Sequence, residues 1–237
     1  MGSGLVADPA SYFRGKVPGE GWVFLEREVM RLKACFLAAA LLALAAPLAA
    51  QDEFHGCGMT GTAKPAAIKA VNRLKNRYTP PADADIDTAV TLKRMLKLGD
   101  DTDRFDEEKA AEVVGYVYDV KPGGKETCNC GATDPDLRDT HIELVPSPAL
   151  NDKTHRVIVE ITPRLRAKMA EQGEDWSTDA LKTAIKHKWI RVRGWLLFDV
   201  EHLGNAEHTN PGGKKIWRAT VWEVHPITVL ALEPQPH

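Results

Sequence analysis

The sequence predicts a mainly β fold with some α: a five-stranded barrel preceded by a short helical segment. Three observations lead to this prediction. The hydrophobic periodicity changes from helical to alternating near Ala110, five alternating apolar segments follow, and a helical connection separates the third segment from the fourth. Five strands with a helix at that place are the plan of the OB-fold, a small Greek-key barrel. We therefore expect a helical segment over residues 51–109 and an OB-like barrel over residues 110–237.

The helical segment follows a stretch that we expect the mature protein to lack. A basic stretch begins at Met30, an apolar run covers residues 34–46, and small residues lead to Ala50. This order is typical of a secretory signal peptide over residues 30–50, cleaved near Ala50, although a buried N-terminal helix would give a similar run. For residues 1–29 we expect a start codon assigned too early, or else a cytoplasmic extension.

A periplasmic or extracellular location follows from this prediction. The mature chain would have no membrane span, because the apolar run is too short to cross a bilayer comfortably. An oxidising compartment favours disulfides. Cleavage would leave Cys57, Cys128 and Cys130, which allow one bridge and one odd thiol. The leading prediction is a bridge from Cys57 to Cys128 or Cys130, and the alternatives are metal ligation and free thiols.

The segment before the barrel is expected to hold two helices. Helical spacing of apolar residues predicts one helix over residues 64–77, with Lys75 on the same face, and a second over residues 87–99. Two acidic runs, at residues 83–87 and 100–103, suggest calcium loops, but neither keeps the ligand pattern of such a loop. We interpret both as solvated turns and helix caps.

The barrel strands are expected in regular order. Alternating apolar residues predict strands over residues 113–120, 140–145, 155–162, 188–199 and 215–225. Between the third and fourth strands we expect helices over residues 163–172 and 177–185, the first with proline in its first turn. Gly115 and Gly194 lie mid-strand, where a barrel bend favours a residue without a side chain.

The fourth and fifth strands each present an inner and an outer face. The residues of the fourth strand that can fill the barrel are Ile190, Val192, Leu196 and Phe198. The residues expected on the outer faces are Arg191, Arg193 and Trp195, and on the next strand Arg218 and Trp222. Such faces can stack rings on tryptophan and hold anionic groups with arginine. Packing of the tryptophans under the N-terminal helices is the alternative.

Composition disfavours several classes of function. The chain carries 31 Lys and Arg against 33 Asp and Glu, and this near balance argues against a general nucleic-acid binder. The sequence has no Gly-rich phosphate loop, nucleophile elbow or H-E-x-x-H motif. A cofactor-dependent oxidoreductase and a serine hydrolase are therefore disfavoured.

Six short segments carry a resemblance to a group of proteins. In chain order they are LKNRYT, TCNC, DTHIEL, VEITP, GWLLFD and WEVHPIT. From about Cys57 onward the chain resembles exported bacterial OB-fold-like proteins of uncharacterised function. The resemblance implies export and the OB-like plan, and it implies no particular activity.

The predicted ligand site is a rim formed by two loops. In an OB barrel, the loop between strands one and two and the loop between strands four and five open at the same end. Here the rim comprises residues 122–143 and 201–214. The candidate metal ligands that gather there are Cys128, Cys130, His141, His202 and His208. Zinc would prefer these side chains and calcium the nearby acids, and a metal-free hairpin is the alternative.

A catalytic hypothesis uses the second strand. Alternation places Asp139, His141 and Glu143 on one face. Two carboxylates beside an imidazole can hold a divalent cation or share acid and base work on a phosphodiester. Residues 138–143 are also loosely similar to the short Asp-Thr-Pro-Glu run of secreted thermonucleases, which are OB-folds that work with calcium. His225, expected at the end of the fifth strand, is interpreted as structural.

We therefore expect an exported binding module whose ligand site is the rim. Its ligand would be an anionic oligomer, a saccharide or a protein. The alternative is a metal-dependent phosphodiesterase or nuclease that uses Asp139, His141 and Glu143. The identity of any metal, zinc or calcium, and the oligomeric state stay open at this stage.

Overall fold

The computed structural model describes residues 53–150 and 152–235. The predicted extension, signal peptide and cleavage site lie outside these residues. The described residues belong to one compact unit, Gln51–His237. Within them, no helix has the length and apolar character needed to cross a membrane.

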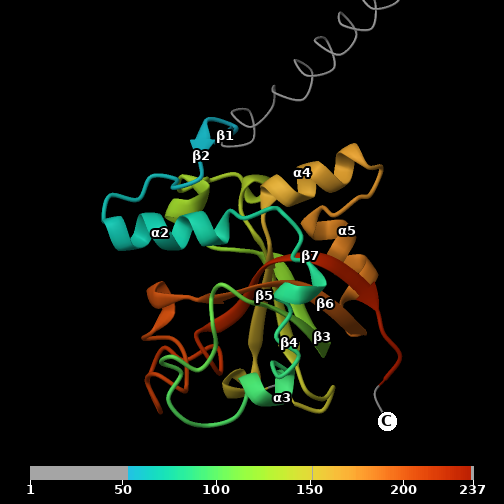
Figure 1. Ribbon diagram of the computed structural model, residues 1–237. Coiled ribbons are helices and arrows are strands. Elements are labelled where there is room, and N and C mark those ends of the chain that lie inside the picture. Colours follow the sequence, from blue (N-terminus) through green and yellow to red (C-terminus); the bar gives the residue numbers. More distant parts are fainter. Residues whose placement is uncertain (1–52, 151, 236–237) are drawn as a thin grey trace, which may run out of the picture. The chain divides into compact units, whose positions relative to one another are not determined.

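Short elements precede the barrel (Figure 1). The two-residue strands β1 (Glu53–Phe54) and β2 (Cys57–Gly58) pair with each other, and α2 (Ala66–Lys75) follows. The helix α2 matches the predicted range, and it lies beside the 3₁₀ turn η3 (Thr127–Asn129) and the last strand of the barrel. The 3₁₀ turn η2 (Asp83–Asp85) leads to α3 (Leu92–Met95).

The helix predicted over residues 87–99 is wrong in extent. Only the single turn α3 forms, and the Thr91 side chain caps it by accepting a hydrogen bond from the Arg94 amide at 3.2 Å. Before it, Ile86 bridges Ala110 and the Asp87 amide donates to the Ala110 carbonyl at 2.8 Å. Thr88 and Ala89 then form a turn, closed by the Val90 amide on the Asp87 carbonyl at 3.1 Å. Tertiary pairing with the first barrel strand therefore overrides local helix propensity.

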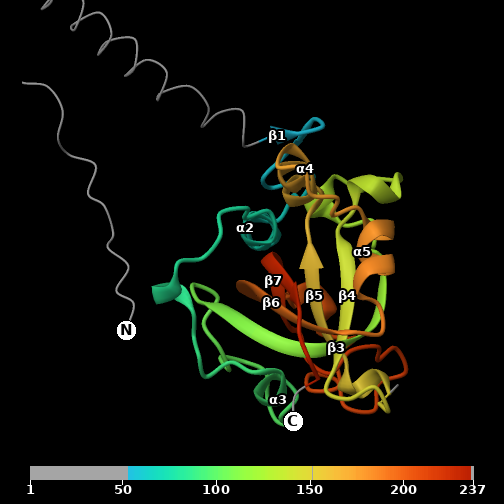
Figure 2. The ribbon, with the colours of Figure 1, turned by 90° about the vertical axis from the view of Figure 1, so that its right-hand side faces the viewer.

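Five strands close into a barrel (Figures 1 and 2). They are β3 (Ala110–Pro122), β4 (Thr140–Val145), β5 (Val157–Ile161), β6 (Trp189–Phe198) and β7 (Trp222–Leu232). Their order around the barrel is β3-β4-β5-β7-β6, and all neighbours are antiparallel except β5 and β7, which are parallel. The structure thus confirms a closed five-stranded barrel in a mixed α and β protein.

The connections carry the remaining helices. Between β5 and β6 lie α4 (Pro163–Glu171) and α5 (Thr178–Ile185), close to their predicted ranges. Thr162 begins α4 as its cap, because its hydroxyl accepts a hydrogen bond from the Leu165 amide at 3.2 Å. The loop between β3 and β4 holds η3 and η4 (Pro135–Leu137), η5 (Lys153–His155) precedes β5, and η6 (Val200–His202) follows β6.

The fifth barrel strand begins later than predicted. It was expected over residues 215–225, but β7 pairs with β6 from the Phe198–Trp222 pair to the Ile190–Leu232 pair. His225 therefore lies inside the strand, before a cis peptide bond to Pro226, and not at the strand's end. The shift changes which side chains of this segment point into the barrel core.

Apolar residues at alternate strand positions fill the barrel. Of the four predicted inward residues of β6, Ile190, Val192 and Leu196 are fully buried in the core, and Phe198 packs against it. Gly194 is required on this strand, because a Cβ atom there would lie 2.2 Å from the Pro226 carbonyl oxygen. The β6–β7 register shifts on both sides of this glycine, as the predicted bend suggested.

One acidic run does not lie where the sequence suggested. Residues 100–103 were interpreted as a solvated turn, but Asp101 is fully buried. Its carboxylate accepts hydrogen bonds from the Thr220 hydroxyl at 2.7 Å and the Val221 amide at 3.0 Å, and it lies 3.0 Å from His208 Nδ1. The run therefore fastens the residues before β3 to the residues before β7.

Candidate functional site

Charged residues occupy the outer face of three barrel strands. The apolar residues of β4, β5 and β7 point into the core, so their neighbours point the other way. These neighbours form what we call the polar face: His141, Glu143, Glu160, Glu223 and His225. All five are buried, because the β3–β4 loop, the β6–β7 loop and α2 cover them.

Lys75 of α2 supplies one positive charge to this cover. Its ammonium lies 2.6 Å from Glu126 Oε2 in the β3–β4 loop, 3.2 Å from Asp199 Oδ2 and 3.5 Å from Glu201 Oε2. Burial alone would lower the pKa of Lys75, but the charges of Glu126 and Asp199 outweigh it and raise the pKa well above its usual value. Lys75 therefore stays charged and joins three segments.

His141 and Glu143 lie at the open side of the polar face. His141 Nδ1 is 2.8 Å from Glu160 Oε1, whereas its Nε2 has no hydrogen-bond partner within the described residues. Glu143 forms ion pairs with Lys121 and, at 2.9 Å, with Arg156. Burial would raise the pKa of Glu143, but His141, Lys121 and Arg156 outweigh it and lower the pKa to about 2. Glu143 is therefore a paired anion.

His225 lies at the centre of the polar face. Its Nδ1 is 3.2 Å from Glu223 Oε1 and 3.4 Å from Glu160 Oε2, and its Nε2 is 3.8 Å from Asp139 Oδ2. Burial would lower the pKa of His225, but Glu223, Glu160 and Asp139 outweigh it and raise the pKa to about 9. The expectation that His225 ends the fifth strand is wrong, because β7 continues past it.

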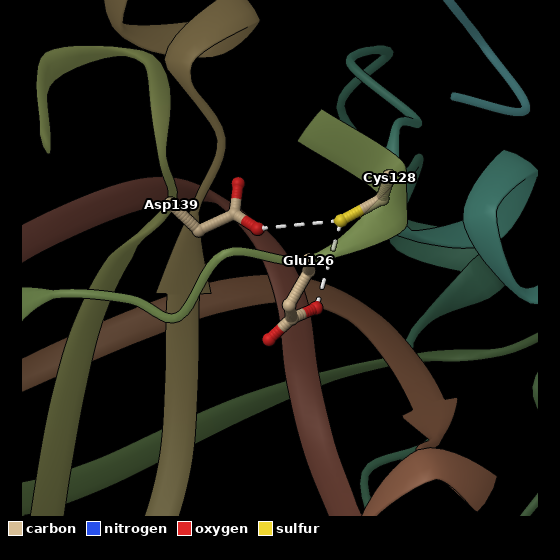
Figure 3. Close-up of side chains that lie close together, drawn as sticks. All are labelled: Glu126, Cys128 and Asp139. Atoms are coloured by element: carbon tan, nitrogen blue, oxygen red, sulfur yellow. Dashed lines mark hydrogen bonds between the residues drawn. The ribbon is translucent and has the colours of Figure 1, made fainter. Parts of the chain in front are cut away.

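Cys128 and Asp139 meet where the β3–β4 loop reaches the polar face (Figure 3). Cys128 Sγ lies 3.8 Å from Asp139 Oδ2 and 3.6 Å from Glu126 Oε2, and Asn129 Nδ2 donates to Asp139 Oδ2 at 2.9 Å. Burial raises the pKa of the Cys128 thiol well above its usual value, and the carboxylates add to this effect. Burial also raises the pKa of Asp139 to about 7, against the opposing charge of His225.

The disulfide prediction is confirmed. Cys57 and Cys130 form a bridge across 73 residues of sequence, and Cys128 is a buried free thiol. The bridge removes Cys130 from the predicted set of metal ligands. His208 is also separate from this set, because it pairs with Asp101. The structure therefore does not bring the five predicted ligands together.

A pocket opens between the two predicted loops. It has a volume of about 380 Å³, and its lining includes residues of the β3–β4 loop from Pro122 to Glu126, together with His141, His202 and Trp217. The Trp217 ring lies 5.4 Å from the His141 ring and 5.1 Å from the His202 ring, centroid to centroid. Lys121 and Lys125 also line the pocket. The two loops of the predicted rim thus meet here.

The arginine and tryptophan side chains predicted to form an open binding face on β6 are instead engaged in ion pairs and packing. Arg191 and Arg193 are partly exposed and form ion pairs, both with Glu112. Trp195 donates its ring N–H to the Thr79 carbonyl at 2.8 Å, and the Arg77 guanidinium covers its ring. Trp195, and Arg193 through its ion pair with Asp83, therefore dock the segment before the barrel, as the packing alternative proposed. Arg191 instead pairs with Glu112 on β3 and with Glu233.

Arg218 and Trp222 do not lie on an exposed outer face, and this part of the prediction is wrong. Arg218 is fully buried and donates to Glu223 Oε2 at 3.0 Å and to the Thr220 carbonyl. Trp222 belongs to the barrel core, in edge contact with Phe198. The late start of β7 places Arg218 in the loop that covers the polar face and Trp222 inside the barrel.

Among the described residues, two groups of three could hold a metal ion, and they share Asp139. The groups are Glu126 with Cys128 and Asp139, and Asp139 with Glu160 and His225, each with ligand atoms within 4.8 Å of one another. Sequence reasoning missed Glu160 and Glu223. The signal that could have found them is an ionisable residue at an alternate position of an otherwise apolar strand, as in HRVIVEIT and WEVH.

No protein-family model matches the chain, and no curated protein matches it.

Proposed function

We propose that this protein is an exported binding module with an OB-like barrel, and that the pocket between its β3–β4 and β6–β7 loops binds the anionic unit of a saccharide. The observation that carries the proposal is the pocket itself, which lies between the two loops from which OB-folds bind oligosaccharides and oligonucleotides. The order β3-β4-β5-β7-β6, with helices between the third and fourth strands, supports the OB-like plan.

The lining of the pocket favours an anionic ligand with a ring. Lys125 supplies a positive charge, Lys121 supplies a second one beside its ion pair with Glu143, and the His141 ring lines the same pocket. Trp217 is half-buried and lies between His141 and His202, so its ring offers an apolar surface for a sugar. A volume of about 380 Å³ suits one small unit of a longer ligand.

The same geometry favours binding over phosphodiester chemistry. Of the three residues in the catalytic hypothesis, His141 lines the pocket, Glu143 is held by Lys121 and Arg156, and Asp139 faces His225. The near balance of acidic and basic residues also favours a saccharide over a nucleic acid. Export is supported by the Cys57–Cys130 disulfide, because such bonds persist in oxidising compartments.

The test is a calorimetric titration of the full chain with glucuronic acid, glucose 6-phosphate and neutral glucose. The two acidic sugars should bind and glucose should not. Lys125→Ala should weaken binding by about tenfold, since a charged hydrogen bond of about 1.4 kcal/mol is lost. Lys182→Ala, an exposed lysine on α5, is the matched control. Equal binding of all three sugars, or binding of none, would overturn the proposal, and preferential binding of a mononucleotide would assign the pocket to nucleic acid.

A further inference from the structure

Three buried side chains from separate segments meet behind the pocket. Asp139 precedes β4, Glu160 lies on β5 and His225 lies on β7, and their exposed fractions are 2%, 5% and 0%. One ligand atom from each lies within 4.8 Å of the others. A carboxylate pair and an imidazole, removed from water and held by three segments of a closed barrel, form a preorganised set of donors.

The unpaired atoms in this group point to a cation. His225 Nε2 and Asp139 Oδ1 are buried and have no hydrogen-bond partner within the described residues. His225 Nε2 lies 3.8 Å from the other Asp139 oxygen, Oδ2, too far for a hydrogen bond. A buried polar atom without a partner costs free energy, and one cation between the imidazole and the carboxylate would satisfy both residues.

The surrounding hydrogen bonds match those of a metal ligand. A histidine that binds metal through one ring nitrogen usually donates the other ring N–H to a carboxylate. His225 Nδ1 lies 3.2 Å from Glu223 Oε1, and Arg218 fixes Glu223 at 3.0 Å. Glu160 is oriented by His141 Nδ1 at 2.8 Å. Hydrogen bonds from residues outside the proposed site thus orient both His225 and Glu160.

Cys128 lies beside this group and offers a sulfur atom. It belongs, with Glu126, to the second set of ligand atoms, which shares Asp139 with the first. Its Sγ lies 3.8 Å from Asp139 Oδ2 (Figure 3). Ligand atoms about 2.0 to 2.3 Å from a tetrahedral zinc ion are separated from one another by roughly 3.4 to 3.7 Å. Glu126, the other acid beside the sulfur, is already paired with Lys75 at 2.6 Å. Asp139 is therefore the acid with which the Cys128 sulfur would share a metal ion.

We propose that Asp139, Glu160, His225 and Cys128 bind one zinc ion. A nitrogen, a thiolate and two carboxylates are ligands that zinc accepts in a four-coordinate site. The ion would deprotonate the buried thiol and neutralise negative charge that the polar face now concentrates around His225. The site is separate from the saccharide pocket, and it does not depend on that proposal.

Metal content and titration test the site. The full, tag-free chain is freed of metal with a chelator, checked for folding by circular dichroism, and titrated with zinc against a competing chelator. We expect about one zinc ion per chain, and zinc binding weakened by more than about tenfold in Asp139→Asn and His225→Gln. Glu174→Gln, an exposed acid beyond α4, should bind as the unchanged chain does.

Cobalt gives a second readout that does not rely on a variant. Replacement of zinc by cobalt in the unchanged chain should produce a sulfur-to-cobalt charge-transfer band, because Cys128 is the free cysteine of the described residues. Cys128→Ser should lose this band. A bound cobalt ion without the band would remove Cys128 from the ligand set. A folded, unchanged chain that takes up neither zinc nor cobalt would overturn the proposal.

Discussion

At the scale of single residues, this protein places ionised groups where apolar ones would normally lie. Lys75, Asp101 and Arg218 are each at most 1% exposed. Lys75 and Asp101 each join parts of the chain far apart in sequence, whereas Arg218 pairs with Glu223 within the same segment. Removing one partner of such a pair leaves an uncompensated buried charge, which is strongly destabilising. These residues therefore fix how the two long loops and α2 lie on the barrel.

Asp101 gives a test of this idea through pH. Burial raises the pKa of Asp101, but hydrogen bonds from His208, Thr220 and Val221 outweigh it and hold the pKa below its usual value. The folded pKa is thus lower than the unfolded one, so the stabilisation is present above the unfolded value of about 3.9 and is lost as the pH falls through the folded value.

We expect Asp101→Asn to lower the free energy of unfolding by about 2 kcal/mol at neutral pH, because the charged partner of Thr220, Val221 and His208 is lost. Urea unfolding of both chains should show this difference shrinking as the pH falls below about 4. Asp103→Asn, an exposed acid of the same run, should show no such trend. A difference that stays constant down to about pH 3 would contradict the assignment.

At the scale of elements, β6 and β7 approach each other closely at Gly194. A Cβ atom on Gly194 would lie 2.2 Å from the Pro226 carbonyl oxygen and 2.6 Å from Ile227 Cα. Both neighbours are backbone, so neither can move aside without disturbing the strand. Gly194→Ala should lower the free energy of unfolding by about 2 kcal/mol, within the range of overpacked cores.

Gly204→Ala is the control for this prediction. An added Cβ atom at Gly204, in the β6–β7 loop, would have no heavy atom within 4 Å. Thermal unfolding should therefore show a clear loss of stability for Gly194→Ala and little change for Gly204→Ala. Equal effects in both variants would mean that the substitution acts through backbone freedom and not through the strand contact.

The elements predicted best are those whose local pattern agrees with their surroundings. The ranges of β6 and α4 and the inward residues of β6 followed from alternation, from the proline in the first helical turn and from the glycine stop. The helix over residues 87–99 failed because the Asp87 amide pairs with the Ala110 carbonyl and a turn follows it. The start of β7 failed because residues 215–221 alternate like a strand but are held by Asp101 and Arg156 contacts.

At the scale of the whole molecule, the site was predicted in outline. The meeting of the β3–β4 and β6–β7 loops followed from the expected barrel plan, and His141 and His202 line the pocket there, whereas Cys128 lies outside its lining. The sequence could not reveal how Lys75, Glu160 and His225 pair. Glu160 and His225 meet from two different strands, and Lys75 pairs with Asp199 across 124 residues of sequence. Such pairings depend on closure of the barrel.

That closure rests on an unusual junction. Where β6 and β7 pair along most of their length, β5 and β7 pair through Val159 and Val224 alone among the described residues. The next residues along each strand, Glu160 and His225, face each other across this junction at 3.4 Å. At this junction, side chains of the polar face therefore hold β5 and β7 together, where backbone hydrogen bonds hold the other strand pairs.

The consequence is that the chemistry of the polar face governs how often the barrel opens. Amide hydrogen exchange reports such local opening. The amides of Val159 and Val224 should exchange faster in His225→Gln than in the unchanged chain, while those of the β3–β6 pair, such as Val113 and Val192, should keep their protection. An ion or ligand bound to the polar face would slow amide exchange at the β5–β7 junction before it slows exchange elsewhere. The exchange rates of Val159 and Val224 would therefore report whether the polar face is occupied.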